Sequence, residues 1–518
     1  MIPQEAITRY LSRNLDSHLW IKRLSEKQID MALAALEPPP KLYPKLRLHQ
    51  KACFLLGVAF PRFSFWNDMG TGKSILALSL LKYWYDLGVI RRAVVFVTSD
   101  KAFSTWEGQF KRFEVDVPYI TLEGSSADKW ATLRRFKEGI VLVSYTGAVS
   151  MNTMTVRGGR GKNKWVLDKA AVKEFGQWAQ ATIFDESTKC GHRSSLTFAL
   201  ADRLRQYSTV RYNLAGRPFG RDPTMLWVQQ YLVDGGESLG ETLGIFRSAF
   251  FTSKPNFWAR WAPEFKFKKA MSKELSAMAQ HRSITYREDE CGDLPPSTFL
   301  EEMVQFSTEA ETYYRSVINQ AIAARGNLRE MENVFLRMRQ IASGFVGMKD
   351  DDGERVQIEF AENPKLDRLL ELADALPDDR KLLVFYEFTH SGRRLVEELK
   401  ALKLRPVWLW SGTKNSREAL RQFQENPQRR VIVVQNRVGA YSLDGLQVAN
   451  YGVFFESPVA CIDREQAEKR LNRQGQLRKV FWYDLLVEGS VDRRIRQFHK
   501  EGGDLLRALL HDPASVLG

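Results

Sequence analysis

The chain has 518 residues, a length that accommodates two or three domains with substantial hydrophobic cores. Hydrophobic residues make up 44% of the chain and charged residues 27%, which excludes a largely disordered protein. Lysine and arginine outnumber aspartate and glutamate by 76 to 62, so the formal net charge is +14. This balance favours an anionic partner such as a nucleic acid, although a basic soluble enzyme has the same composition.

The cysteines and the apolar segments of the sequence indicate the cellular compartment of the protein. The four cysteines lie far apart without zinc-site spacing, and we interpret them as reduced, mostly buried thiols. The N-terminus lacks a secretory signal pattern, and no run of about 18 apolar residues suggests a membrane span. These features predict a cytoplasmic protein without a membrane partner.

Residues 1–45 predict an N-terminal helical accessory element, because apolar residues recur at near-helical spacing up to Leu36, and three prolines follow from Pro38. Residues 46–245 alternate short apolar strands with helical stretches, which is typical of a parallel sheet covered by helices on both faces. The strands expected in this first lobe include 63–66, 94–97, 140–143 and 182–184.

Residues 246–375 are helical and aromatic-rich, and we expect a helical insertion or linker. Its aromatic side chains between 246 and 267 are expected to pack in a core, with stacking on bases as the alternative. Residues 376–518 alternate again and predict a second α/β lobe. Its expected strands are 382–385, 407–410, 431–434, 453–455 and 480–485.

The string Gly70-Thr71-Gly72-Lys73-Ser74 follows an apolar strand and precedes a helical stretch. Glycines let backbone N–H groups approach phosphates, and the N-terminus of the following helix adds a positive dipole. Lys73 is expected to reach the β- and γ-phosphates, and Ser74 to bind Mg²⁺. Asn67 stands where the full pattern has its first glycine, so an ordinary glycine turn is the alternative.

An acidic pair, Asp185-Glu186, directly follows the predicted strand 182–184. Ligand sites of open α/β sheets lie at the carboxyl ends of their strands. We expect Asp185 to hold Mg²⁺ and Glu186 to orient and deprotonate the attacking water. An adjacent acidic pair alone is commonly a solvent-exposed feature, but its place downstream of a phosphate-binding loop favours catalysis.

A basic string runs from Gln466 to Gln476 in the second lobe. Arg470 and Arg473 stand three residues apart, which predicts that they share one face of a helix. Both would then point at one anion and act as arginine fingers on a γ-phosphate. A solvated basic helix is the alternative.

Taken in order, these motifs resemble those of the Swi/Snf-type ATPases of helicase superfamily two over residues 42–500. LRLHQ is similar to the motif that recognises adenine. In the first lobe, the strings DMGTGKS, VTSDKAFSTWEGQF, VLVSYTGAV, IFDEST and NLAGRPFGRDPTMLW resemble the family's motifs I, Ia, Ib, II and III, respectively. In the second lobe, KLLVFYEF, QNRVGAYSLDGLQVAN and QAEKRLNRQGQ resemble motifs IV, V and VI, respectively. The resemblance implies an α/β fold of two tandem RecA-like parallel-sheet lobes with a helical insertion between them.

The resemblance also implies binding residues. Gln50 is nominated to contact ATP together with the loop from Gly70 to Ser74. Motifs Ia, Ib, IV and V contact the nucleic-acid backbone in this family, which nominates Ser99, Lys101, Tyr145, Gly412 and Gln435.

A glycine-rich basic stretch lies between motifs Ib and II. Its four positive charges favour a contact with phosphates, and a solvated loop is the alternative. The charged residues of this stretch are Arg157, Arg160, Lys162 and Lys164.

Some positions depart from the family pattern. Arg217 replaces the second threonine of Thr-Gly-Thr-Pro in motif III, and Ser442 and Asp444 replace the usual glycine and asparagine of motif V. The resemblance implies that these positions couple the ATP state to the nucleic acid, so the departures bear on stepping. The hydrolytic residues are all present.

The resemblance therefore implies an ATP- and Mg²⁺-dependent DNA helicase or translocase of a compact phage or bacterial type. It is expected to move on duplex or branched DNA without sequence preference, and to act as a monomer. One alternative is an RNA-directed helicase. Another is a non-catalytic DNA- or polymerase-associated scaffold in which the altered motif III is uncoupled from hydrolysis.

Overall fold

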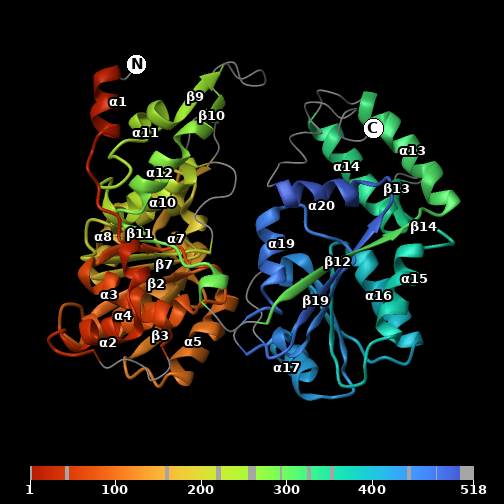
Figure 1. Cartoon of the computed structure of the whole chain (residues 1–518), viewed down its shortest axis with the longest axis horizontal. Helices are drawn as coiled ribbons and strands as arrows, with labels where there is room; N and C mark the ends of the chain where they lie inside the picture. Colours follow the sequence, from red (N-terminus) through yellow and green to blue (C-terminus); the bar gives the residue numbers. More distant parts are fainter. Residues whose placement is uncertain are drawn as a thin grey trace. The chain divides into compact units, whose positions relative to one another are not determined.

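The computed structural model describes residues 3–40, 46–157, 163–216, 223–254, 264–291, 295–323, 328–349, 355–439, 445–473 and 475–501. The chain divides into two compact units, Met1–Gly292 and Asp293–Gly518 (Figure 1). Each unit contains its own parallel sheet covered by helices.

A parallel sheet forms the centre of the first unit. Among its described residues seven strands occur in the order β11-β1-β8-β7-β2-β4-β3, and each pair is parallel. Its central strands are apolar and buried on both faces, as parallel sheets require. The strands are β1 (Arg62–Phe65), β2 (Arg92–Val97), β3 (Tyr119–Thr121), β4 (Gly139–Ser144), β7 (Ala181–Asp185), β8 (Val210–Leu214) and β11 (Ser283–Ile284).

Helices cover both faces of this sheet. Val95 and Val97 of β2 pack in one core with α3, α4 and α5, whereas Val94 and Phe96 pack in a second core with the helices of the other face. This division follows from the alternation of side chains along a strand. The helices are α3 (Leu48–Ala59), α4 (Lys73–Asp86), α5 (Phe103–Arg112), α6 (Ser126–Arg135), α7 (Tyr145–Met151), α8 (Lys169–Trp178), α9 (Leu196–Leu204), α10 (Thr224–Asp234), α11 (Leu243–Phe250) and α12 (Ser272–Ala279).

The N-terminal segment is helical, as its sequence predicts, and packs on the first unit. It contains α1 (Gln4–Leu11), the 3-10 turn η1 (Leu19–Arg23) and α2 (Glu26–Ala34). The Tyr10 hydroxyl donates to the carbonyl of Leu239 over 2.9 Å, and Ile29 of α2 is buried in the core that contains α3.

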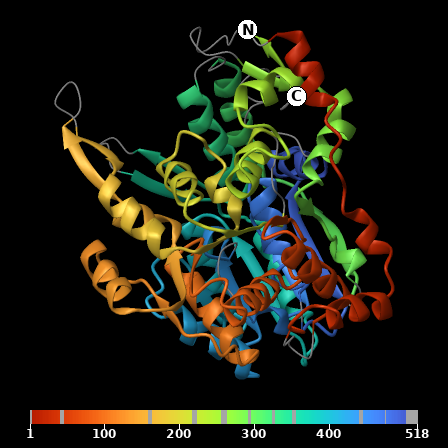
Figure 2. The ribbon, with the colours of Figure 1, turned by 90° about the vertical axis from the view of Figure 1, so that its left-hand side faces the viewer.

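Two antiparallel hairpins extend the first unit. One consists of β5 (Thr153–Arg157) and β6 (Asn163–Leu167), and the other of β9 (Phe251–Lys254) and β10 (Glu264–Phe267). The β5–β6 hairpin is the orange-yellow ribbon that projects at the upper left of Figure 2. Its connection to the unit is short, because β5 follows α7 and β6 precedes α8.

The second unit contains another parallel sheet, with strands in the order β12-β19-β18-β15-β17-β16. Five of these strands are those predicted from residues 376–518. The sixth, β12, lies at the edge of the sheet and comes from the preceding segment. The strands are β12 (Ser297–Val304), β15 (Leu382–Tyr386), β16 (Val407–Leu409), β17 (Val431–Gln435), β18 (Tyr451–Phe454) and β19 (Val480–Val487).

Helices again pack on both faces of this sheet. Val384 of β15 packs with α15 and α16, and Phe385 packs with α17 and α19. A further core joins α13, α14 and α20. The elements are α13 (Thr308–Ala323), α14 (Leu328–Ala342), the hairpin β13 (Phe345–Lys349) and β14 (Arg355–Glu359), α15 (Pro364–Asp374), α16 (Thr389–Ala401), α17 (Ser416–Glu425), α18 (Asn436–Gly439), α19 (Cys461–Glu468) and α20 (Val491–Glu501).

The α/β fold class with two parallel sheets is confirmed, but the segment 246–375 differs from one helical insertion. Its first part gives β9, β10, α12 and β11 to the first unit, and its later part gives β12, α13, α14 and α15 to the second. The physical reason is pairing between distant segments, since β11 pairs with β1 and β12 with β19.

The aromatic residues at the start of this segment pack as expected. Phe246 and Phe250 are fully buried, and Phe265 and Phe267 pack against the same core. Phe257, Trp258 and Trp261 lie outside the described residues. Core packing is therefore confirmed for the described rings.

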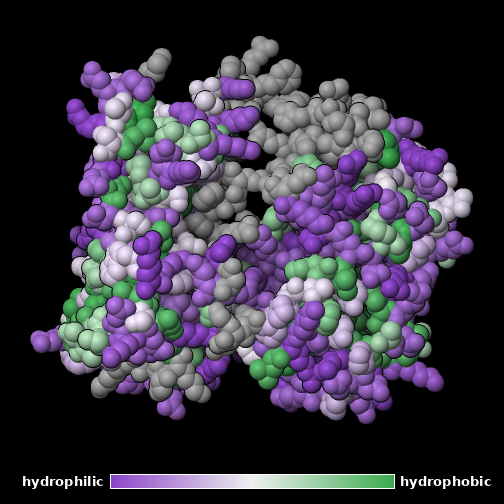
Figure 3. Space-filling model, viewed as in Figure 1, coloured by the Kyte–Doolittle hydropathy of each residue, from purple (hydrophilic) through white to green (hydrophobic). Residues whose placement is uncertain are grey.

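The surfaces match a chain with abundant charge. In the view of Figure 3, hydrophilic residues cover most of the described face of each unit, and apolar residues form small separate areas. Among the described helices, none has the length and apolar character that crossing a membrane requires.

Candidate active site

The predicted catalytic residues of the first unit meet at the carboxyl edge of its sheet. Phe65, the last residue of β1, and Asp185, the last residue of β7, both pair with Leu214 of the intervening strand β8. Strands lie about 4.8 Å apart, so the ends of β1 and β7 are separated by roughly 10 Å. The loop after β1 and the acidic pair after β7 therefore open onto the same edge.

The phosphate-binding loop has the predicted strand, loop and helix context. Gly70 and Gly72 have φ of +83° and +81°, and α4 begins directly afterwards at Lys73. A Cβ added at Gly72 would lie 2.1 Å from the Gln50 Nε2 atom, so the Gln50 side chain would have to move, and the left-handed backbone favours glycine there. This geometry favours phosphate binding over an ordinary glycine turn.

Asn67 takes a supporting role at the position where the full motif has glycine. Its side-chain oxygen accepts a hydrogen bond from the backbone N–H of Tyr286 over 2.9 Å. The adjacent backbone N–H of Asp68 donates to the Tyr286 carbonyl, also over 2.9 Å. The segment after β11 thus fixes the start of the loop, a contact that the sequence did not indicate.

Lys73 is directed into this loop. Its ammonium donates to the carbonyls of Asn67 and Asp68, at 2.8 and 3.0 Å. Burial lowers the pKa of Lys73, and the nearby carboxylates of Glu186 and Asp185 oppose that effect. The lysine and the acidic pair are therefore close enough to interact electrostatically.

Gln50 and His49 hold the other side of the loop. The Gln50 side chain donates to the Thr71 carbonyl over 2.9 Å and accepts from the backbone N–H of Arg47 over 2.9 Å. Burial lowers the pKa of His49, so a neutral ring donates from Nε2 to the same Thr71 carbonyl over 2.8 Å. Gln50 thus supports the loop here, and its contact with adenine stays a prediction.

Asp185 and Glu186 occupy different environments. Burial, followed by the charge of Glu186, raises the pKa of Asp185 to about 7, while the indole N–H of Trp106 donates to Asp185 Oδ2 over 3.0 Å. Glu186 adopts φ of +50°, a left-handed conformation uncommon outside glycine. The carboxylates of Asp185 and Glu186 therefore point in different directions, which agrees with the separate roles expected of them.

The oxygen donors at this edge suit Mg²⁺. Ser74 lies in the first turn of α4, and Asp185 ends β7. No cluster of three or more His, Cys, Asp or Glu side chains suited to a metal occurs among the described residues. A hydroxyl and one carboxylate fit an ion that completes its shell with phosphates and water.

Tyr145 has a structural role that corrects its nomination as a nucleic-acid contact. Its side chain is 4% exposed, and its hydroxyl donates to the Asp185 carbonyl over 2.9 Å. Its ring also stacks on Phe96 of β2. The tyrosine therefore supports the acidic motif from inside the core.

The other nominated contacts differ in accessibility. Ser99 is half-buried beyond β2, and Gly412 is exposed beyond β16. The Gln435 side chain accepts from Ser411 N–H and donates to the Glu387 carbonyl, at 3.1 and 3.2 Å. It therefore orders the loop that contains Gly412.

The basic stretch forms part of the β5–β6 hairpin. Arg157 ends β5 and Lys164 lies in β6, and both are exposed. Arg160 and Lys162 lie outside the described residues, as do Arg217, Ser442 and Asp444, and nothing is described for the Lys101 side chain. Contact of this hairpin with nucleic acid stays a prediction.

The structure corrects the expected shared helix face of Arg470 and Arg473. Helix α19 ends at Glu468, and both arginines lie in the turns that follow. Gln476 stabilises these turns, because its side-chain amide donates to the carbonyls of Leu471 and Ala449. The arginines remain part of one short connection at the end of α19.

Arg464 is an anchor of α19 that the sequence analysis missed. Its side chain is 1% exposed and forms two hydrogen bonds with the buried carboxylate of Asp484 on β19. It also donates to Glu468 over 2.7 Å and lies over the Phe454 ring at 3.5 Å. Nothing in the local sequence pattern separated this arginine from the other charged residues of α19.

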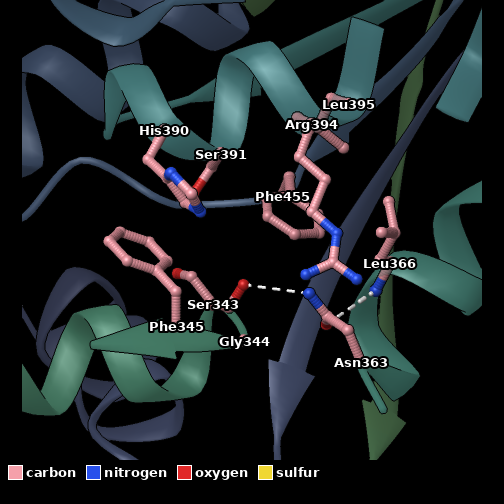
Figure 4. Close-up of a pocket in the computed structure, with 10 residues that line it drawn as sticks. All are labelled: Ser343, Gly344, Phe345, Asn363, Leu366, His390, Ser391, Arg394, Leu395 and Phe455. Carbon is pink, nitrogen blue, oxygen red and sulfur yellow. Dashed lines mark hydrogen bonds between the residues drawn. The ribbon is translucent and has the colours of Figure 1, made fainter. Parts of the chain in front are cut away.

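A small pocket in the second unit serves a different purpose. His390, Arg394 and Asn363 line it in Figure 4. His390 and Arg394 already pair with Glu359, at 2.9 and 3.0 Å, and Asn363 caps α15. These contacts indicate a structural junction.

No protein-family model matches the chain. The CHD3-type chromatin-remodeling factor PICKLE of Arabidopsis thaliana is 20% identical over 488 residues, which cover 86% of this chain and 33% of that protein. Transcription regulatory protein SNF2 of Saccharomyces cerevisiae is 21% identical over 461 residues, which cover 83% and 25%. By sequence, the chain is similar to Swi/Snf-type helicase-like ATPases.

The chain spans about a third or less of the length of those two relatives. A solved Sulfolobus solfataricus SWI2/SNF2 ATPase core in complex with dsDNA is 19% identical, with a TM-score of 0.40. The match covers 92% of this chain and 94% of that one.

Proposed function

We propose that this Swi/Snf-type chain is an ATP-dependent DNA helicase or translocase. In this proposal ATP hydrolysis drives movement on duplex or branched DNA. The observation that carries it is the meeting of Lys73 with Asp185 and Glu186 at one sheet edge, where Lys73 interacts electrostatically with both carboxylates. A lysine loop opposite an acidic pair is the arrangement used for phosphoryl transfer from nucleotides.

The residues of the loop have separate parts in the proposed reaction. Backbone N–H groups from Gly70 to Ser74 bind phosphate oxygens, and Lys73 turns from the loop carbonyls to the β- and γ-phosphates. Mg²⁺, when bound, neutralises phosphate charge, and Ser74 and Asp185 are the residues that would hold it.

Glu186 performs the proton transfer in this proposal. It orients a water molecule, whose oxygen forms a bond to the γ-phosphorus while the bond from that phosphorus to the leaving ADP oxygen breaks. The proton of the water passes to the Glu186 carboxylate. Arg470 and Arg473 neutralise the charge that grows in the transition state.

DNA is the proposed partner because the chain has a net charge of +14 and an exposed basic hairpin. Contacts with phosphates fix the position of a protein without reading sequence, as a motor requires. Ser99, Lys101, Gly412 and the hairpin residues Arg157 and Lys164 are proposed to provide such contacts. We further propose that the chain acts as a monomer in a cytoplasmic compartment.

Phosphate release tests the proposal. The rate is measured with Mg²⁺ and ATP alone, and then with single-stranded, duplex and branched DNA and with RNA of matched length. We expect stimulation by duplex or branched DNA and no turnover after chelation of Mg²⁺. Equal or greater stimulation by RNA would point to an RNA-directed helicase, and absence of turnover under every condition would point to a non-catalytic scaffold.

A further inference from the structure

The β5–β6 hairpin presents an aromatic side chain to solvent. Trp165 is 59% exposed, and it has no ring or hydrogen-bond partner among the described residues. The buried tryptophans Trp106 and Trp227 instead donate their indole N–H groups within the core. An exposed indole offers a large flat ring that can stack on a ligand and an N–H group that can donate to it.

The charge around Trp165 indicates what this contact is. Arg157 and Lys164 are exposed on the two strands, and no acidic residue occurs between Thr153 and Leu167. A protein partner would have to be strongly acidic to match this surface. A nucleic acid supplies both an anionic backbone for the cations and flat bases for the indole.

The strand register places Trp165 and Arg157 on one face of the hairpin, whereas Lys164 pairs with Val156 on the other. Trp165 pairs with Thr155, and the neighbouring pair on the same face is Arg157 with Asn163. Met154 pairs with Val166 and therefore belongs to the opposite face. One face thus combines a guanidinium with an indole, and the other offers an exposed methionine as an internal control.

The hairpin is also joined firmly to the candidate active site. At its base the Asp168 backbone N–H donates to the Asn152 carbonyl over 2.9 Å, and Leu167 packs on the core. The helix before it, α7, starts at Tyr145, whose hydroxyl donates to the Asp185 carbonyl. The seven residues of α7 therefore connect the base of the hairpin with a tyrosine that contacts the acidic motif.

We propose that Trp165 stacks on an unpaired base of DNA at a junction or fork, with Arg157 bound to a neighbouring phosphate. This inference rests on the proposed DNA-dependent function and deepens it, because it names DNA with exposed bases as the preferred substrate. Bases inside a continuous duplex are stacked on each other, so the indole can distinguish a fork from a blunt duplex.

The test compares binding of the full chain to a forked DNA and to a blunt duplex of equal length at one salt concentration. Stacking on one base predicts that Trp165→Ala weakens fork binding by about 5- to 150-fold. Blunt-duplex binding should change less than twofold. Trp165→Phe should recover part of the fork affinity, and Met154→Ala should bind both DNAs like the wild type.

A base analogue adds a direct readout. With 2-aminopurine as the first unpaired base of the fork, stacking on the indole should quench its fluorescence in the wild type and not in Trp165→Ala. Fork binding within twofold of the wild type, or equal weakening on both DNAs, would overturn the assignment. In the first case the exposed indole would belong to a protein contact.

The outcome is separable from the proposed function. DNA-stimulated phosphate release is measured on the wild type, whereas fork selectivity is measured without ATP. A selective loss in Trp165→Ala with no wild-type turnover would retain the hairpin contact and reject the motor. Turnover by the wild type, together with unchanged fork binding by Trp165→Ala, would support the motor and reject the hairpin contact.

Discussion

In the proposed reaction, single side chains at the carboxyl edge of the first sheet have separate parts in hydrolysis. Lys73 starts a helix and can exchange loop carbonyls for phosphates, whereas Glu186 sits in a left-handed turn beside a buried aspartate. Binding and proton transfer therefore depend on different residues. Substitutions should separate the two steps.

For the first prediction, Lys73→Ala should abolish both tight ATP binding and hydrolysis, because the charge that faces the phosphates is lost. Glu186→Gln should retain ATP binding and reduce DNA-stimulated turnover by at least about 10²-fold, since the base is removed and the loop remains. Nucleotide titration and phosphate release measure the two effects, and Glu123→Gln is an exposed control. Near wild-type turnover of Glu186→Gln would remove this residue from the catalytic set.

Arg470 and Arg473 are predicted to affect turnover far more than nucleotide affinity. An arginine that meets charge only in the transition state contributes about 10³- to 10⁵-fold to rate in related phosphoryl transfers. Arg470→Ala and Arg473→Ala should therefore lower the DNA-stimulated rate strongly and change ATP affinity little. A rate within about threefold of the wild type would exclude the altered residue from this role.

Arg464 is predicted to determine the stability of the second unit. Arg464→Met would leave the fully buried Asp484 with Arg496 as its remaining cationic neighbour among the described residues, at 3.0 Å. Breaking such a buried pair costs about 3 to 5 kcal/mol in the free energy of unfolding. Urea unfolding should show this loss, whereas Arg493→Met in an exposed pair of α20 should cost about 0 to 1 kcal/mol. Equal effects of the two variants would contradict the anchoring role.

At the scale of elements, short segments outside the two parallel sheets hold the cationic side chains of interest. These segments are the β5–β6 hairpin and the turns after α19. Among the described residues, the strands of the hairpin pair with each other and not with the strands of the central sheet. Its cations are exposed and can contact phosphates without disturbing the core. The arginines after α19 instead depend on the anchor that Arg464 provides.

Salt dependence tests the hairpin cations. Replacing Arg157 and Lys164 with serine should remove two phosphate contacts and weaken duplex binding. The log–log slope of affinity against salt should flatten by about 0.9 for each lost contact on duplex DNA and about 0.7 on a single strand. The same change in Lys137 and Lys173, which are exposed lysines elsewhere in the first unit, is the control. An unchanged slope would indicate that the hairpin cations are solvated and do not contact phosphates.

At the scale of the whole molecule, the two parallel α/β units agree with a motor that moves along phosphates. The last prediction is that the chain tracks duplex DNA and remodels branched strands more readily than it unwinds a long blunt duplex. Opening base pairs costs about 1.4 kcal/mol per step in stacking, which requires an element that holds the strands apart. The hairpin is one small candidate for that element.

Three ATP-dependent assays check this prediction: displacement of a third strand from a triplex, migration of a four-way junction, and unwinding of a forked duplex. We expect displacement and migration, with little unwinding beyond the fork. Processive unwinding of long duplex without triplex displacement would place the chain with strand-separating helicases.

The sequence by itself predicted those features that depend on neighbouring residues. The central strands of both sheets are continuous apolar runs, so β2, β4, β7, β15 and β17 were predictable within a residue or two. The phosphate-binding loop was predictable as well, because its two glycines and its helix are contiguous. The acidic pair could be recognised from its position directly after a buried strand.

Tertiary structure alone decided the features that depend on distant segments. Strands β11 and β12 acquire their roles only by pairing with β1 and β19, which divided the segment 246–375 between the units. Tyr145 turned inward because the Asp185 carbonyl offered its hydroxyl a buried partner, and Arg464 became an anchor because Asp484 lies beside it on another strand. Such partners are set by the packing of the chain, since burial leaves a polar group stable only where a matching group lies close by.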